Sequence, residues 1–407
     1  MYSKCSKEKR NVFDQDVPFL RKIIMKTSYT CIRPTYVREF RCDGKSCKSH
    51  CCGDWRITID EDTIRKYSNM EPKAEGEEIL SHIIYRKPLK SFGISLQEDY
   101  RCPFLDDDYL CKLQKRYGED YLSDICVTYP RVFYQVEDLL EESLAITCPV
   151  AARQILFSGE QLRFETVEMP FPRKTQVAGW TKKVVRRKDS WRQIQETCIR
   201  LLQERRFSLN QRLLYLLSLL EQAERQPEEQ LPEWLQSLSE EGFDSLNVPV
   251  PVFSPTRHVS YMAGLFSRLY QMDMTEEKMA SLQEIYGKNM HQFLPAMMEI
   301  YHAPMENWLV NEFFLRFYPF AFDGSLLYNG KLFAASAKLL EFCLLLTAIA
   351  HKGSLGEEKF LQVVERISQR LDHSRDGMSF LKDSIPQEDR TESAFDFAEY
   401  AVGTTGD

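Results

Sequence analysis

The sequence lacks an uncharged apolar run long enough to cross a lipid bilayer. The best candidate, residues 331–353, carries Lys338 and Glu341 near its middle, so we expect a buried core helix there. Residues 1–26 begin with a basic cluster but lack the apolar stretch of a secretory signal. We therefore expect a cytoplasmic protein with no membrane partner. We interpret the residues before Met25 as a disordered extension or the product of an early start codon.

The sequence also lacks a large excess of either positive or negative charge. The chain of 407 residues has 53 Lys and Arg against 60 Asp and Glu, a net charge of −7 at pH 7. This balance argues against a dedicated nucleic-acid-binding protein. A basic run from Arg173 to Lys188 is typical of a solvated linker, and alternatively of a surface that binds nucleic acid or an acidic protein.

The length exceeds what one hydrophobic core usually supports, so we expect two domains in a mainly α (α+β) protein. Residues 33–155 are predicted to form a cysteine-rich module of short strands and helices, in which Asp60 caps a helix. A basic connecting segment, 156–190, precedes an all-helical domain over 191–384, where apolar residues recur at helical spacing. Flexible segments are predicted at the two ends, 1–32 and 385–407.

Cysteine is concentrated in one part of the chain. Cys198 and Cys343 lie in apolar helical contexts, which are typical of buried, inert thiols. Cytosolic thiols stay reduced, so the dense group favours metal binding or redox chemistry over disulfides. Eight of the 12 cysteines form this group, and they are the candidate metal ligands: Cys42, Cys47, Cys51, Cys52, Cys102, Cys111, Cys126 and Cys148.

The spacing of these cysteines bears on the kind of metal. In a zinc knuckle two residues separate the two ligands, and no pair of cysteines in the group has that spacing. Iron–sulfur clusters accept thiolates from separate segments, so a cluster is favoured and zinc is the alternative. Adjacent side chains such as Cys51 and Cys52 point opposite ways in an extended segment, so both do not serve one metal atom comfortably. Cys148 precedes Pro149 at a predicted helix start, where the helix dipole favours a thiolate.

Four stretches together closely resemble the flagellin lysine-N-methylase family. The first three are also similar to a wider class of cysteine-rich zinc- or iron-chelating domains. The resemblance begins at about Arg33, is dense through Gln154, and is looser beyond. The stretches are YVREFRCDGKSCKSHCCGDWRITID, CPFLDDDYLCKLQKRYGEDYLSDICVTYPR, SLAITCPVAAR and ENWLVNEFFLRFYPF.

The resemblance implies a bacterial cytoplasmic enzyme that methylates lysine side chains of flagellin. It also implies S-adenosylmethionine as methyl donor and an iron–sulfur cluster of the four-iron (4Fe-4S) type. The cysteines of the family fall on the eight positions given above. Arg131 also matches, and it is expected to hold cluster sulfides or a substrate carboxylate, or to form an ordinary salt bridge.

No motif marks the methyl-donor site or a catalytic residue. The chain has no glycine-rich strand-to-helix turn of the nucleotide-binding type. Asn307 and Asn311 lie about one helical turn apart, with Glu306, Glu312 and several aromatic residues nearby, and such a face could hold a sulfonium or ammonium through carboxylate and cation–π contacts. The same pattern is typical of an amphipathic core helix.

The spacing of the cysteines also bears on whether a cluster would take part in radical chemistry. Radical enzymes commonly space three cysteines with gaps of three and then two residues. Cys47 and Cys51 satisfy the first gap, but Asp54 stands where the third cysteine is needed. A structural or regulatory cluster is therefore favoured. The rival to a methylase is a non-catalytic, metal-dependent redox sensor or adaptor that binds a protein partner through its helical domain.

Overall fold

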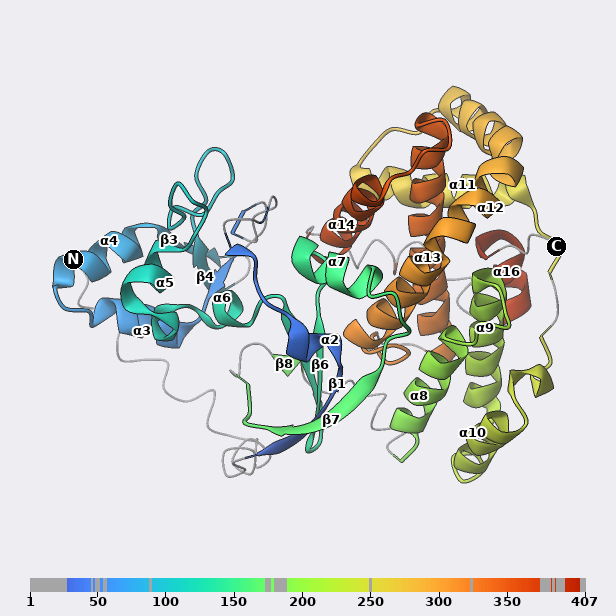
Figure 1. Cartoon of the computed structure of the whole chain (residues 1–407), viewed down its shortest axis with the longest axis horizontal. Coiled ribbons are helices and arrows are strands. Elements are labelled where there is room, and N and C mark those ends of the chain that lie inside the picture. The colour runs from blue at the N-terminus through green and yellow to red at the C-terminus, as the bar shows by residue number, and fades with distance from the viewer. Residues whose placement is uncertain are drawn as a thin grey trace.

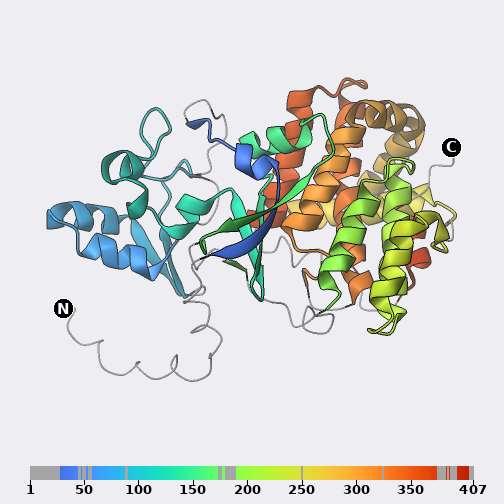
Figure 2. The same cartoon turned by 60° about the horizontal axis from the view of Figure 1, so that its bottom comes forward.

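The computed structural model describes residues 28–44, 47, 52–53, 57–87, 90–172, 177–178, 189–248, 251–322, 325–373, 382, 385 and 392–402. Most of the predicted terminal segments, nearly all of the basic run and Cys51 lie outside these residues. A small lobe, a central sheet and a helical domain follow one another along the longest axis of the molecule (Figures 1 and 2).

The small lobe surrounds its own hydrophobic core, which extends from Ile57 to Leu122. Asp60 caps α3, as predicted, by accepting a hydrogen bond from the Thr63 amide (2.7 Å). The other carboxylate oxygen of Asp60 accepts from the Asp124 amide (3.0 Å), which ties α3 to α6. The elements of the lobe are β2 (Thr58–Ile59), α3 (Glu61–Ser68), α4 (Lys73–Ser81), β3 (Ile83–Arg86), β4 (Ser91–Ile94), α5 (Lys112–Tyr117), η3 (Glu119–Tyr121) and α6 (Asp124–Thr128).

The central sheet has five strands in the order β7-β1-β6-β5-β8. β1 runs parallel to β6 and antiparallel to β7, whereas β5 and β6 form an antiparallel hairpin. Neighbouring residues of β6 show that the sheet is covered on two sides, since Leu139 packs against the core shared with the helices and Leu140 lies in a separate cluster. The strands are β1 (Tyr29–Pro34), β5 (Arg131–Val136), β6 (Leu139–Leu144), β7 (Phe164–Met169) and β8 (Val177–Ala178).

Helices make up the rest of the described chain, so the prediction of a mixed N-terminal region followed by a mainly helical part is confirmed. The large core unites these helices with α2, α7 and one face of the sheet. The helices are α2 (Tyr36–Glu39), α7 (Pro149–Leu156), α8 (Trp191–Leu202), α9 (Leu209–Arg225), α10 (Leu231–Glu240), η6 (Phe243–Ser245), α11 (Pro255–Tyr270), α12 (Glu276–Leu315), α13 (Leu326–Ala350), α14 (Glu357–His373) and α16 (Ala394–Ala401).

Two long helices form the centre of the helical domain. α13 is long and apolar enough to cross a membrane, but 83% of its most apolar window is buried inside the protein, as expected for a core helix. α12 contains Pro295 and Pro304, and its backbone leaves the helical conformation at Tyr301 (φ −109°, ψ 16°). A proline removes one helical hydrogen bond and crowds the preceding turn, which explains the kink.

Close packing of α3 on α4 depends on Gly76. A methyl group added there would lie 2.1 Å from the backbone oxygen of Tyr67, whereas a methyl group at Gly287 in α12 meets nothing within 4 Å. We expect Gly76→Ala to lower the free energy of unfolding of the small lobe by about 1–3 kcal/mol. Gly287→Ala should raise stability by up to about 1 kcal/mol, because alanine favours the helix. Thermal unfolding measures the stability of both variants, and hydrogen exchange of small-lobe amides localises the effect of Gly76→Ala. Equal changes in stability for the two variants would contradict the packing argument.

Candidate functional site

Backbone hydrogen bonds bring separate cysteine segments of the small lobe together. The Cys102 amide donates to the Cys52 carbonyl oxygen (2.7 Å), and Gly53 pairs with Arg101 in an antiparallel bridge. A second bridge joins Cys111 to the segment that follows Cys102. Cys52, Cys102 and Cys111 therefore lie on adjoining segments although they are far apart in sequence.

Buried Tyr67 interacts electrostatically with further cysteines of the small lobe. The hydroxyl of Tyr67 donates to the Tyr121 carbonyl oxygen (2.6 Å). Burial raises the pKa of Tyr67, and charge on Cys126, Cys111, Asp60 and Cys102 raises it further. Three of the predicted ligands, one of them on α6, therefore influence the same phenol.

A tight turn places Cys42 and Cys47 next to this group. The Gly44 amide donates to Cys42 Sγ (3.3 Å), and the Cys47 amide donates to the Gly44 carbonyl oxygen (3.1 Å). Gly44 has a positive φ of 55°, and a methyl group there would lie 3.1 Å from the side chain of Leu110. The turn therefore packs against the residue that precedes Cys111.

Cys148 occupies a different environment. It is the N-cap residue of α7, whose first residue is Pro149 as predicted, and it is buried in the large core. The hydroxyls of Tyr129 and Thr147 lie 3.0 Å apart, which links the end of α6 to the approach to α7. Cys148 is thus connected to the chain that leaves the small lobe.

No disulfide bond joins any of the ten described cysteines. Across the described residues, no group of three or more Cys, His, Asp or Glu side chains is arranged to hold a single metal ion. The metal centre and its eight ligands therefore stay a prediction. What the structure adds is convergence, since six of the predicted ligands, all except Cys51 and Cys148, lie on the adjoining segments described above.

The predicted cofactor residues on α12 are buried and contact other parts of the protein. Asn311 accepts hydrogen bonds from the hydroxyls of Tyr36 and Ser143, the second at 3.2 Å, so it joins α12 to α2 and the sheet. Glu312 pairs with Arg316, which also pairs with Asp372 of α14 (2.6 Å). Both side chains serve tertiary contacts.

Asn307 makes the third of these attachments. Its amide nitrogen donates to the Ile155 carbonyl oxygen in the last turn of α7 (3.1 Å) and to Ser158 Oγ just after α7 (3.0 Å). Its amide oxygen is buried without a hydrogen-bond partner among the described residues. Asn307 thus keeps one acceptor unused, whereas methyl-donor binding by the three residues stays a prediction.

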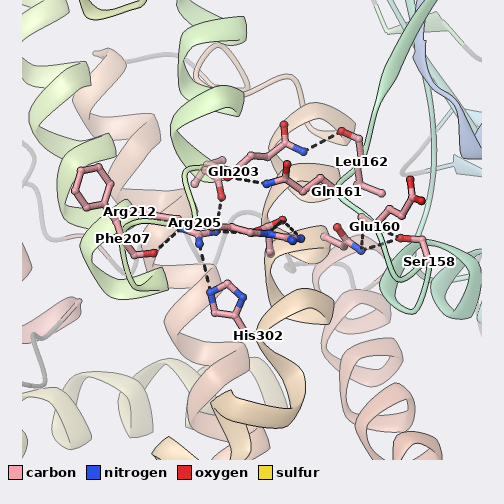
Figure 3. A network of polar contacts seen from close by, with 12 residues as sticks. Ser158, Glu160, Gln161, Leu162, Gln203, Arg205, Phe207, Arg212 and His302 are labelled. Atoms are coloured by element: carbon pink, nitrogen blue, oxygen red, sulfur yellow. Dashed lines mark hydrogen bonds and ion pairs between the residues drawn. The ribbon is translucent and has the colours of Figure 1, made fainter. Parts of the chain in front are cut away.

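Sequence reasoning missed a network that includes Arg205, Arg212 and His302 (Figure 3). Glu306 is fully buried and accepts hydrogen bonds from Arg205 (2.9 Å) and from fully buried Arg212 (2.7 Å). Arg212 also donates to the Phe207 carbonyl oxygen (2.9 Å) and faces His302 Nε2 at 3.3 Å. Burial, followed by the positive charge of Arg212, lowers the pKa of His302. The network fixes the turn between α8 and α9 against α12.

A second buried polar group involves the charges that interrupt α13. Lys338 donates to Asn210 (2.9 Å) and pairs with Glu341. These side chains, with His258 and with Val402 after α16, line a small cavity, and it has room for roughly one water molecule. His258 Nδ1 donates to the Tyr400 carbonyl oxygen (3.0 Å), which leaves the other ring nitrogen as an acceptor. Burial and the charge of Lys338 lower the pKa of His258 to about 3.

Arg131 forms a salt bridge. It pairs with buried Glu142 (3.2 Å), which Arg33 contacts from β1 (3.2 Å), and its guanidinium lies 5.5 Å from the ring centroid of Phe40. Arg131 therefore joins β5 to β6 and to the chain that follows α2.

We expect Glu306→Gln to lower the free energy of unfolding by about 3 kcal/mol or more, because Arg212 would stay buried without its counter-charge. Glu284→Gln is the matched control, since Glu284 pairs with Lys288 on the surface of α12, and it should change stability by less than about 0.5 kcal/mol. Urea unfolding measures both variants. A small effect of Glu306→Gln would show that the network is not a stabilising one.

The lowered pKa of His258 predicts a loss of stability in acid. Below the unfolded-state pKa of about 6.5, the unfolded chain binds a proton that the folded protein excludes, so stability falls as the pH decreases. Between pH 6.5 and pH 5 this residue should account for about 1.5 kcal/mol. Urea unfolding at several pH values should show a shallower pH dependence for His258→Asn. The same change at exposed His291 should leave the pH dependence as it is.

Comparison with known proteins shows which family the chain resembles. The model of the FliB lysine N-methylase C-terminal domain matches residues 195–395. The lysine-N-methylases of Salmonella choleraesuis and Salmonella typhimurium are each 35% identical over 130 residues, which cover 31% of this chain and 32% of the relative. The flagellar biosynthetic protein FliU of Salmonella muenchen is 34% identical over 130 residues, which cover 77% of that protein. No solved structure matches the chain. The chain belongs to the FliB lysine N-methylase family.

Proposed function

We propose that the protein transfers a methyl group from S-adenosylmethionine to lysine side chains of flagellin. The observation that carries this proposal is the relationship to two lysine-N-methylases and to a flagellar biosynthetic protein. The alignment spans about a third of the length of the two lysine-N-methylases. Activity, methyl donor and substrate are therefore proposals for this chain.

The reaction sets a clear chemical requirement. The lysine ammonium loses a proton, the neutral nitrogen attacks the methyl carbon, and the bond from that carbon to the sulfonium sulfur breaks. The products are a methylated lysine, S-adenosylhomocysteine and a proton. The site must hold the amine in line with the methyl group and accept its proton.

Asn307, Asn311 and Glu312 are our candidates for contacts with the methyl donor. Asn311 and Glu312 are engaged with the sheet and with Arg316, so a donor there would have to replace existing contacts. The amide oxygen of Asn307 is the exception, because it is a buried acceptor without a partner among the described residues. Asn307 is therefore the first residue to mutate when the donor site is mapped.

We also propose that the N-terminal cysteines hold an iron–sulfur cluster of the four-iron type, with zinc as the alternative. The support is the backbone hydrogen bond between Cys102 and Cys52 and the bridge that brings Cys111 to the segment after Cys102, together with the electrostatic influence of Cys102, Cys111 and Cys126 on Tyr67. Such a cluster takes four thiolates from separate segments. Methyl displacement needs no iron, so we assign the cluster a structural or regulatory role. Reduced thiols of this kind fit a cytoplasmic protein.

One observation favours a second candidate, a redox sensor or adaptor without catalysis. Cys42 and Cys126 are exposed, and exposed thiols are open to reversible oxidation. Such a protein would bind a partner more or less tightly after oxidation and would not bind the methyl donor. Titration calorimetry with S-adenosylmethionine separates the two candidates.

A direct test uses protein purified without oxygen, S-adenosylmethionine with a labelled methyl group, and purified flagellin. We expect label on lysine side chains, located by mass spectrometry. Flagellin whose lysines have been acetylated is the matched control and should take up no label. Donor binding without any transfer to unmodified flagellin would reject flagellin as the substrate, and absence of donor binding would reject the methylase proposal.

The metal proposal predicts a difference between cysteine classes. Cys126→Ser and Cys47→Ser should lower the bound iron and destabilise the small lobe, because metal binding contributes directly to folding. Cys343→Ser is the matched control, since this thiol is buried in α13 within the large core. Iron and sulfide analysis with a visible spectrum measures the effect. Equal iron loss from all three variants would reject the ligand assignment.

A further inference from the structure

The outer strand of the small sheet exposes apolar side chains. The strand order β2-β4-β3 puts β3 at an edge, and in the described chain β3 pairs with β4 alone. Ile84 and Tyr85 are 45% and 53% exposed. Neighbouring residues of a strand point to opposite faces, so apolar surface is open to solvent on both sides of this edge. Edge strands of soluble proteins usually avoid this arrangement.

Part of the exposure has a local cause. The residue opposite Ile84 on β4 is Gly93, which offers no side chain for a cross-strand contact. Tyr85 does have such a contact, since its ring packs edge-on against Phe92 with centroids 5.2 Å apart. Ile84 can therefore gain a cross-strand neighbour only from beyond the outer edge.

The register also shows which backbone groups face outward. The Ser95 amide donates to the His82 carbonyl oxygen (2.8 Å). In an antiparallel ladder, pairs that exchange hydrogen bonds alternate with pairs that do not. Since His82 is hydrogen-bonded to its partner on β4, the next residue of β3 that is hydrogen-bonded to β4 is Ile84. Ile83 and Tyr85 are therefore not hydrogen-bonded to β4. Their amide and carbonyl groups point away from β4, and they have no hydrogen-bond partner among the described residues. The edge thus presents two donors and two acceptors in strand geometry.

We propose that this edge pairs with the same edge of a second copy of the chain. An antiparallel pair around a twofold axis at Ile84 sets Ile83 opposite Tyr85 of the second copy, and the reverse. Each of these pairs exchanges two hydrogen bonds, so all four outward groups of each copy are satisfied. Ile84 then lies opposite its own equivalent at a non-bonded position, where cross-strand side chains are closest.

Charge favours a second copy over a foreign strand. Exposed Glu77 and Glu78 precede β3, and exposed Lys87 and Lys90 follow it. In an antiparallel pair the acidic end of one copy, at the end of α4, lies on the same side as the basic end of the other copy, in the turn after β3. A strand of uniform charge would match one end and be repelled by the other. We expect a weak dimer, because this short strand offers far less than the roughly 1,200–2,000 Å² of a stable interface.

Sedimentation velocity of the full-length protein over a wide concentration range tests the proposal. The wild type should shift from monomer toward dimer as its concentration rises. Ile84→Lys should raise the dissociation constant by about tenfold or more, because it places two ammonium groups side by side at the axis. Ile300→Lys, at another exposed isoleucine (67% exposed, on α12), should leave the constant unchanged. A wild type that stays monomeric, or equal effects of the two changes, would overturn the proposal.

A charge exchange tests the antiparallel direction separately. Glu78→Lys and Lys90→Glu should each weaken association, because each reduces the attraction between the acidic end of one copy and the basic end of the other. The double variant should restore association to near the wild-type level, since the attraction is recovered with its sign reversed. Unchanged thermal unfolding will show that the variants fold. If the double variant is as weak as the single ones, the antiparallel twofold arrangement is wrong.

Discussion

The fold depends on a short buried polar stretch of α12, from Glu306 to Glu312. Burying these side chains is costly unless each finds a partner. Glu306 finds one in Arg212 on α9, Asn307 in the last turn of α7 and the chain after it, and Asn311 in the sheet. About two turns of helix therefore join elements that are up to 275 residues apart in sequence. The sheet and the helical domain share a core because this stretch fixes one against the other.

Because of this attachment, much of the N-terminal part of the chain packs with the helical domain. Residues such as Tyr36, Leu144 and Ile155 pack in the large core with the helices, although they are near the cysteines in sequence. The small lobe keeps a far smaller core of its own. A core of that size gives limited stability on its own. Ligation of the converging thiols would supply the missing stability, which is a physical reason to assign the metal a structural role.

Local features were predictable because their signals are local. The cap by Asp60, the helix that starts at Pro149 and the burial of α13 all follow from neighbouring residues, and the structure confirms them. The pairing of β1 with β6 and β7 was not predictable, because a parallel pair is set by distant segments. The pair of Glu306 with Arg212 was missed for a related reason. A charged residue in a helix looks solvated until its partner, 94 residues away, is known.

The same packing limits where chemistry can occur. Binding sites for molecules as large as S-adenosylmethionine usually enclose about 300–1,000 Å³. The cavity between Lys338 and His258 has room for roughly one water molecule, and His258 on its wall is held by the carbonyl oxygen of Tyr400 in α16. Binding of the donor there would require the walls of the cavity to move apart. The unused acceptor of Asn307 lies instead between the end of α7 and Ser158. This buried acceptor is the observation on which our proposal of Asn307 as a donor contact rests, and the side chain is 1% exposed, so a donor that reaches it must displace the packing around α7.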